Sequence, residues 1–135
     1  MFETKIVIVL RDDLATWQKL NVTAFLTSGL IAQHPAIIGE PYKDAAGRVY
    51  NPMAIQPVVV LAADQETLRK IHLRSIDRGI VPSAYVEEMF ATGHDAANRE
   101  VFSRFNPMDA KLAGIALRAE KKSADKITKG AKMHP

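Results

Sequence analysis

KIVIVLRDDL, residues 5–14, joins an unbroken apolar run to a polar turn. The run Lys5–Leu10 does not alternate between polar and apolar side chains, which is typical of a strand covered on both faces. Asp12 and Asp13 offer side-chain acceptors to the free N–H groups of a following helix. We therefore predict a buried strand that leads directly into a helix.

The rest of the chain continues this alternation of strand and helix. Apolar spacings of three and four predict a helix over Ala15–Gln33, ended at His34 because Pro35 follows. Further on we expect a hairpin or ordered excursion in Ala36–Met53, a buried strand at Pro57–Ala62, and a helix capped by Asp64 that ends at Arg78-Gly79. Later elements are an edge or bulged strand at Ile80–Val86, one helical turn at Glu87–Ala91, a helix from its cap Asp95 to about Phe105, and a last strand within Ala110–Ala119. This order predicts a single α/β domain over residues 1–135.

Two sets of aromatic and apolar side chains are interpreted as packing residues. Trp17 is expected in the core or at an interface, although a lone tryptophan near a helix start could also line a pocket. Val101, Phe102 and Phe105 are expected to face inward from their helix.

The net charge of +3 is unevenly distributed. Residues 1–110 carry 11 Lys and Arg against 13 Asp and Glu, whereas residues 111–135 carry 7 against 2. Clustered lysines can neutralise phosphates, but no aromatic side chain interleaves them for base stacking. We interpret residues 121–135 as a basic, solubilising tail with at most one helical turn near Asp125, and expect at most weak, salt-sensitive contact with nucleic acid.

The composition excludes several kinds of site. The chain has no cysteine, which excludes disulfides, thiolate zinc sites and thiol nucleophiles. Its histidines show no HExxH motif, and the Gly-rich nucleotide loops and the Gly-x-Ser-x-Gly elbow are absent, so we expect no metal and no cofactor. With no secretory signal and no apolar run longer than Ile6–Leu10, we expect a cytoplasmic protein without membrane contact.

The opening strand and the later block QPVVVLAADQETL, Gln56–Leu68, resemble the archaeal and eukaryotic (type 2) peptidyl-tRNA hydrolases. They resemble still more closely an uncharacterised bacterial family of unknown function with the same fold. The resemblance implies a three-layer α-β-α arrangement, a mixed sheet with helices on both faces, and a homodimer.

The hydrolase's functional residues do not carry over. Aligned without gaps, the chain matches at Lys5, Arg11, Asp13 and Leu14, whereas Leu20, Ala24 and Thr27 stand at the family's Lys, Gln and His positions. Lys19 lies one residue off, a turn of about 100° around the helix. The resemblance thus implies the fold without the activity. The alternative is a hydrolase of peptidyl-tRNA, aminoacyl-tRNA or a related ester, with Lys19 and either Glu87 or Glu88 in catalysis.

The stretch ATGHDAANRE, Ala91–Glu100, is the most distinctive likeness to the bacterial family. A glycine-containing loop that enters a helix presents N–H groups and the helix dipole to an anion. We prefer to interpret the stretch as a helix cap, in which Asp95 is the N-cap and would repel an anion. For function we expect a small anionic or nucleotide-like ligand of unknown identity, bound by Arg11, Asp13, Thr92, His94, Asn98 and Arg99.

Overall fold

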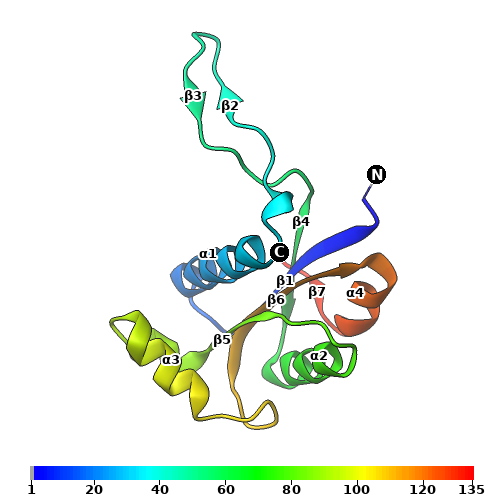
Figure 1. Ribbon diagram of the computed structural model, residues 1–135. Coiled ribbons are helices and arrows are strands. Elements are labelled where there is room, and N and C mark those ends of the chain that lie inside the picture. Colours follow the sequence, from blue (N-terminus) through cyan, green and yellow to red (C-terminus); the bar gives the residue numbers. More distant parts are fainter. Residues whose placement is uncertain (1) are drawn as a thin grey trace.

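A five-stranded mixed sheet organises the computed structural model, which describes residues 2–135 (Figure 1). Its strands lie in the order β5-β6-β1-β4-β7, with bounds β1 Thr4–Arg11, β4 Val58–Ala63, β5 Ser83–Val86, β6 Leu112–Glu120 and β7 Lys132–Met133. Strand β1 is parallel to β4 and antiparallel to β6, and β6 is antiparallel to β5. Strands β1, β4 and β5 therefore run in one direction, and their carboxyl ends lie at one edge of the sheet.

Helices cover both faces of this sheet (Figure 1). On one face, Ile6, Ile8 and Leu10 of β1 pack against α1 (Thr16–Gln33). On the other, Val7 and Val9 pack against α2 (Gln65–Asp77) and α4 (Lys121–Ile127). Because successive side chains of a strand point to opposite faces, β1 is apolar throughout, and the predicted doubly covered strand and α/β class are confirmed.

The predicted cap of the first helix is wrong, although its end at Gln33 is confirmed. Helix α1 has Ala15 as its N-cap, and the Ala15 N–H donates to Gln18 Oε1 at 2.9 Å. Asp13 instead accepts from Arg11 Nε at 2.6 Å, and the Asp12 N–H donates to the Ala63 carbonyl at 3.0 Å. Both aspartates thus belong to the turn that closes β1.

The second helix follows its prediction closely. Asp64 Oδ1 accepts from the Thr67 N–H at 2.8 Å, as an N-cap should. Gly79 follows the helix with φ of +70°, a backbone conformation that favours glycine.

The edge strand and the helix that follows it give one confirmation and two corrections. Strand β5 begins just after Pro82, lies at the sheet edge and is bulged at Tyr85–Val86, as predicted. The 3₁₀ helix η2 (Glu87–Ala91) matches the expected helical turn. Helix α3 (Asp95–Ser103) is capped by His94, not Asp95, because His94 Nδ1 accepts from the Ala97 N–H at 3.2 Å. Val101 and Phe105 pack on the core, but Phe102 is exposed.

The excursion after α1 is an arm that extends away from the sheet (Figure 1). It contains the 3₁₀ helix η1 (Pro35–Ile37) and the antiparallel strands β2 (Tyr42–Lys43) and β3 (Val49–Tyr50), which confirms a hairpin. Asp44 closes its turn by accepting from the Ala46 and Arg48 N–H groups and the Tyr50 hydroxyl at 2.9–3.0 Å. Gly47, at φ of +83°, supplies the turn's positive φ.

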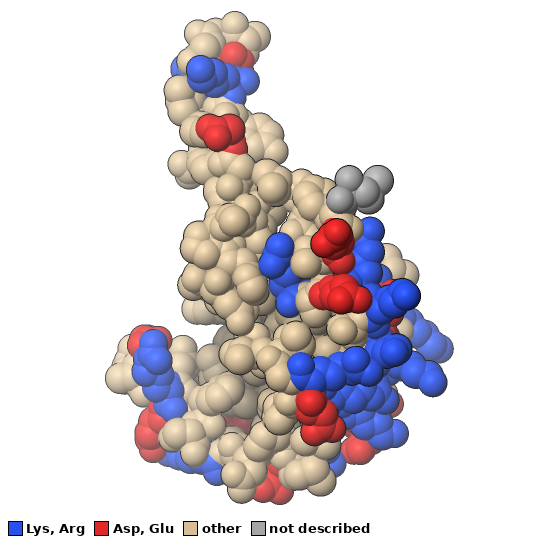
Figure 2. Space-filling view, turned by 45° about the vertical axis from the view of Figure 1, so that its right-hand side comes forward, with Lys and Arg blue, Asp and Glu red and all other residues tan. Residues whose placement is uncertain are grey.

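The interpretation of residues 121–135 as a solvated tail is wrong. Ala124 and Ile127 of α4 are fully buried, and β7 pairs with β4. Arg74 of α2 fastens the end of α4 by donating to the carbonyls of Ile127 and Lys129 at 3.1 and 2.8 Å. The lysines of this segment therefore lie on α4, on β7 and in the turn between them, and not on a free tail. Figure 2 shows positive side chains gathered on one side of the protein. Within residues 2–135, no helix is both long and apolar enough to cross a bilayer.

Candidate functional site

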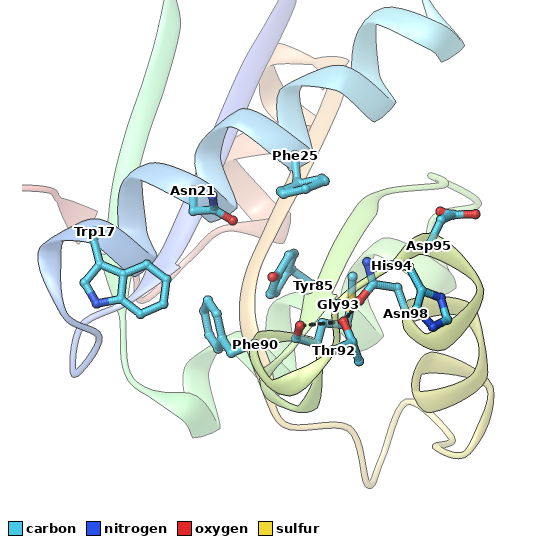
Figure 3. Close-up of a pocket in the computed structure, with 11 residues that line it drawn as sticks. Trp17, Asn21, Phe25, Tyr85, Phe90, Thr92, Gly93, His94, Asp95 and Asn98 are labelled. Carbon is cyan, nitrogen blue, oxygen red and sulfur yellow. Dashed lines mark hydrogen bonds between the residues drawn. The ribbon is translucent and has the colours of Figure 1, made fainter.

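A pocket of about 320 Å³ lies between α1, the end of β5, η2 and the loop that enters α3 (Figure 3). We call it the aromatic pocket, because four of its lining residues are Trp17, Phe25, Tyr85 and Phe90. The other lining residues are Asn21, Met89, Thr92, Gly93, His94, Asp95 and Asn98. It lies beside the carboxyl ends of β1 and β5, the edge at which α/β sheets usually bind ligands.

The aromatic rings contact one another in a chain. Phe90 meets Trp17 edge-to-face, with ring centroids 5.9 Å apart, and lies 5.1 Å from Tyr85. Tyr85 in turn lies 6.0 Å from Phe25. Trp17 is 61% exposed and lines the pocket, so its expected core position is wrong, while a position at an interface stays a prediction. Exposed aromatic faces around a hollow are typical of a binding site.

Tyr85 connects the pocket to the core. It is 5% exposed, and its ring packs with the cluster under α1. Burial raises the pKa of the Tyr85 hydroxyl above its ordinary value, so the phenol stays protonated at neutral pH and can donate a hydrogen bond. In Figure 3 the hydroxyl points into the space near Asn21 and Phe90.

The polar wall is formed by the loop that enters α3. The Thr92 hydroxyl donates to the Met89 carbonyl at 2.9 Å and also contacts the Asn98 side chain. A hydroxyl has one proton, so the Met89 carbonyl and Asn98 Oδ1 share it as acceptors, and the Asn98 amide nitrogen remains a donor. His94 accepts through Nδ1 as the helix cap, which places the proton of the neutral ring on Nε2.

The ligand-binding residues expected from the sequence divide into two groups. Thr92, His94 and Asn98 line the aromatic pocket, and Arg99 lines an adjoining hollow. Arg11 and Asp13 line neither.

Arg11 is 8% exposed, and its Nη1 donates to Glu87 Oε2 at 2.7 Å. Burial acts to lower the pKa of Arg11, but the hydrogen bonds to Asp13 and Glu87 outweigh it and raise that pKa.

The candidate catalytic residues Lys19, Glu87 and Glu88 form no ion pair with one another among the described residues. Glu87 is engaged by Arg11, and Glu88 has one buried carboxylate oxygen, Oε1, with no hydrogen-bond partner among residues 2–135. Lys19 is half-buried on α1 and forms no ion pair with either glutamate in the described part of the chain. None of the three lines the aromatic pocket. No group of three or more His, Asp or Glu side chains in residues 2–135 is placed to hold a metal ion.

The sequence analysis missed five lining residues, Asn21, Phe25, Tyr85, Met89 and Phe90. A signal for two of them was present, because Trp17, Asn21 and Phe25 recur at spacings of four and so share one face of α1. Tyr85 and Phe90 carry no comparable signal, since their position depends on where β5 joins the sheet.

Comparison with known proteins identifies relatives whose function is also unknown. The family profile "Protein of unknown function (DUF2000)" matches residues 4–135. No curated protein matches the chain. A solved structure of a protein of unknown function from Agrobacterium tumefaciens str. C58 is 69% identical, covers 100% of both chains and superposes with a TM-score of 0.99. With nearly all of its length matched, the chain belongs to the DUF2000 family.

Proposed function

We propose that the aromatic pocket binds a small nucleotide-like ligand whose planar base packs against Trp17, Phe25, Tyr85 and Phe90. The observation that carries the proposal is the exposure of Trp17 and Phe25 around one hollow, where a flat ring could cover their free faces. Stacking of a base on aromatic side chains contributes about 1–3 kcal/mol per base.

The polar groups of the pocket suit the edge of a heterocycle. Asn21 and Asn98 each carry an amide, which offers both donors and an acceptor. The Tyr85 hydroxyl and His94 Nε2 add donors. This combination of hydrogen-bond donors and acceptors matches the edge of a nucleobase, where donors and acceptors alternate, better than it matches a saturated hydrocarbon ligand.

The charge of the site favours the base as the anchor. The lining includes Asp95 but neither lysine nor arginine. Arg99 is the cation that lines the adjoining hollow, where its Nε donates to Asp95 Oδ2 at 2.7 Å. Both side chains of that ion pair are more than three-quarters exposed, so the pair contributes little. A ligand phosphate could therefore take the place of the Asp95 carboxylate as the partner of Arg99.

Trp17 provides the test, because it is the one tryptophan of the chain and lines the pocket. Its fluorescence is followed during titration with adenosine, adenosine monophosphate and ribose 5-phosphate. We expect saturable quenching by the first two and none by ribose 5-phosphate, which lacks a base. Quenching by ribose 5-phosphate equal to that by adenosine would show that the anion, not the base, is recognised.

Matched aromatic variants locate the binding site. Phe90→Leu removes a ring of the pocket, and we expect about tenfold weaker binding of adenosine, equivalent to the stacking energy of one ring. Tyr50→Leu removes an exposed ring of the distant arm and serves as the control. Equal binding by the parent protein and both variants contradicts the proposal.

An ester hydrolase is the alternative function, and one observation favours it. The Oε1 atom of the half-buried Glu88 is itself buried and has no hydrogen-bond partner among the described residues. The test is turnover of peptidyl-tRNA by the parent protein, and its loss in Lys19→Ala. We expect no turnover, since Lys19 and Glu88 do not line a common pocket.

The finer fold assignment and the homodimer are also proposals. The mixed sheet with α1 on one face and α2 and α4 on the other supports a type 2 peptidyl-tRNA hydrolase-like fold. Superposition on such an enzyme tests the first proposal, and light scattering at micromolar concentration tests the second.

A further inference from the structure

A second hollow lies where β1 and β4 begin, on the face of the sheet opposite α1. Val59 lines it and pairs with Val7, whose side chain packs against α2 and α4. Its volume is about 320 Å³, near the lower end for small-molecule sites. It shares no lining residue with the aromatic pocket, so the two sites can be tested separately.

The walls of this hollow are apolar, and its floor is a buried glutamine whose side-chain amide is hydrogen-bonded at both ends. Phe2, Pro57 and Val59 form its walls. Gln56 is 7% exposed and lies at the floor, with its Nε2 donating to the Thr4 carbonyl at 3.2 Å and its Oε1 accepting from Arg118 at 3.4 Å. Both ends of the amide are engaged, so the floor needs no polar group from a ligand.

Among residues 2–135, the rim carries one unpaired positive charge. Lys5 is neutralised by Asp125, with Nζ and Oδ1 2.8 Å apart. Lys121 lines the same rim and has no acidic partner within residues 2–135. Glu3 and Glu120 are near Lys121, but neither lines the hollow.

We propose that this hollow binds a small amphiphilic carboxylate, with its aliphatic body against Phe2, Pro57 and Val59 and its carboxylate at Lys121. Apolar walls provide the affinity for the body, and the ammonium provides a charge-assisted hydrogen bond at the rim. Lys5 and Asp125 also line the hollow, but their charges are paired with each other, so Lys121 is the cation left for the carboxylate among the described residues.

Backbone amide NMR of the full chain tests the proposal with three probes, octanoate, 1-octanol and butyrate. We expect octanoate to shift the signals of Thr4, Gln56 and Val59 saturably. The affinity for 1-octanol should be about tenfold lower because it lacks the charge. The affinity for butyrate should also be about tenfold lower, because it lacks most of the apolar body. Equal binding of octanol and octanoate overturns the assigned ligand class. Shifts confined to Trp17 and Phe90, or no saturable shift, overturn the site.

A matched pair of lysine variants decides the role of the rim. Lys121→Gln is expected to weaken octanoate about tenfold, the effect of one hydrogen bond to a charged group. Lys122→Gln, which removes the neighbouring charge outside the hollow, is expected to change affinity less than about twofold, as a screened exposed charge does. Equal effects of the two variants overturn the assignment to Lys121. Val59→Phe fills the hollow and should abolish binding; if that variant fails to fold, the lysine pair still decides.

Discussion

Arg11 and Glu87 form a hydrogen-bonded ion pair across 76 residues of sequence, with 2.7 Å between Nη1 and Oε2. The pair joins the end of β1 to the start of η2. Since η2 carries Phe90, this contact helps to hold one wall of the aromatic pocket against the sheet. Arg11 is therefore a structural support for the pocket, and not one of its lining residues.

Replacing Arg11 should destabilise the protein. Arg11→Met leaves Glu87 partly buried without its partner, and breaking a buried pair in this way costs about 3–5 kcal/mol. The Glu87 side chain is 33% exposed, so we expect a smaller loss, about 2 kcal/mol, in the free energy of unfolding measured with urea. Asp13→Asn is the control, because Asp13 contacts the same guanidinium from an exposed position, and its loss should stay below about 1 kcal/mol. Similar losses in the two variants would contradict this assignment.

Stability should fall in mildly acidic solution because of His72. Burial lowers the pKa of His72 below its ordinary value of 6.5, and its Nδ1 is buried without a hydrogen-bond partner among the described residues. The unfolded chain therefore takes up a proton at a higher pH than the folded protein. The free energy of unfolding is expected to be constant above about pH 7, to decrease as the pH falls through 6.5, and to level off below the folded pKa.

The measurement is urea unfolding between pH 7.5 and pH 5, in the parent protein and in His72→Gln. This range avoids Asp44 and Asp64, whose hydrogen bonds to backbone N–H groups lower their pKa values below 3.8. We expect the decrease to be smaller in His72→Gln. An unchanged decrease in that variant would assign the effect to other groups.

How far the sequence predicts this fold depends on how local each interaction is. Helix α2 follows from its own residues, because Asp64 caps it and Gly79 ends it within one segment. Asp13, by contrast, could cap a helix, but its carboxylate accepts a hydrogen bond from Arg11 instead. The position of Arg11 depends in turn on Glu87, which is distant in the sequence. The aromatic pocket was predicted only in part for the same reason, since Tyr85 and Phe90 come from segments that meet Trp17 only when β5 joins β6.

The C-terminal segment should contribute strongly to stability. Its many lysines favoured the interpretation as a solvated tail, but Ala124 and Ile127, three residues apart on α4, are fully buried. Ile127→Ala leaves a cavity in the core, and we expect a loss of about 2–4 kcal/mol in the free energy of unfolding. Lys126→Ala, exposed on the same helix, should change it by less than about 0.5 kcal/mol. A small effect of Ile127→Ala would restore the interpretation as a tail.

The arm should open independently of the sheet. Asp44 makes most of the side-chain hydrogen bonds in the turn of the hairpin, and Tyr42, Val49 and Tyr50 are exposed. In Asp44→Ala, faster hydrogen exchange is expected in residues 42–50, with the exchange of β1 and the melting temperature unchanged. Faster exchange in β1 as well would show that the arm is coupled to the core.

The lysines of residues 121–135 should bind nucleic acid only weakly. Lys121, Lys122, Lys126, Lys129 and Lys132 face one acidic residue of that segment, Asp125. No aromatic side chain lies in the segment to stack on bases, so contacts are limited to phosphates and depend on released counterions. Titration with tRNA at about 50 and 200 mM salt should show binding at the lower salt and its loss at the higher. The variant with Lys122, Lys126 and Lys129 all changed to Gln should lower the slope of log K against log salt by about 2–3, because three phosphate contacts are removed. Tight binding at the higher salt, with an unchanged slope in the variant, would place RNA recognition elsewhere on the protein and make a role in translation the better proposal.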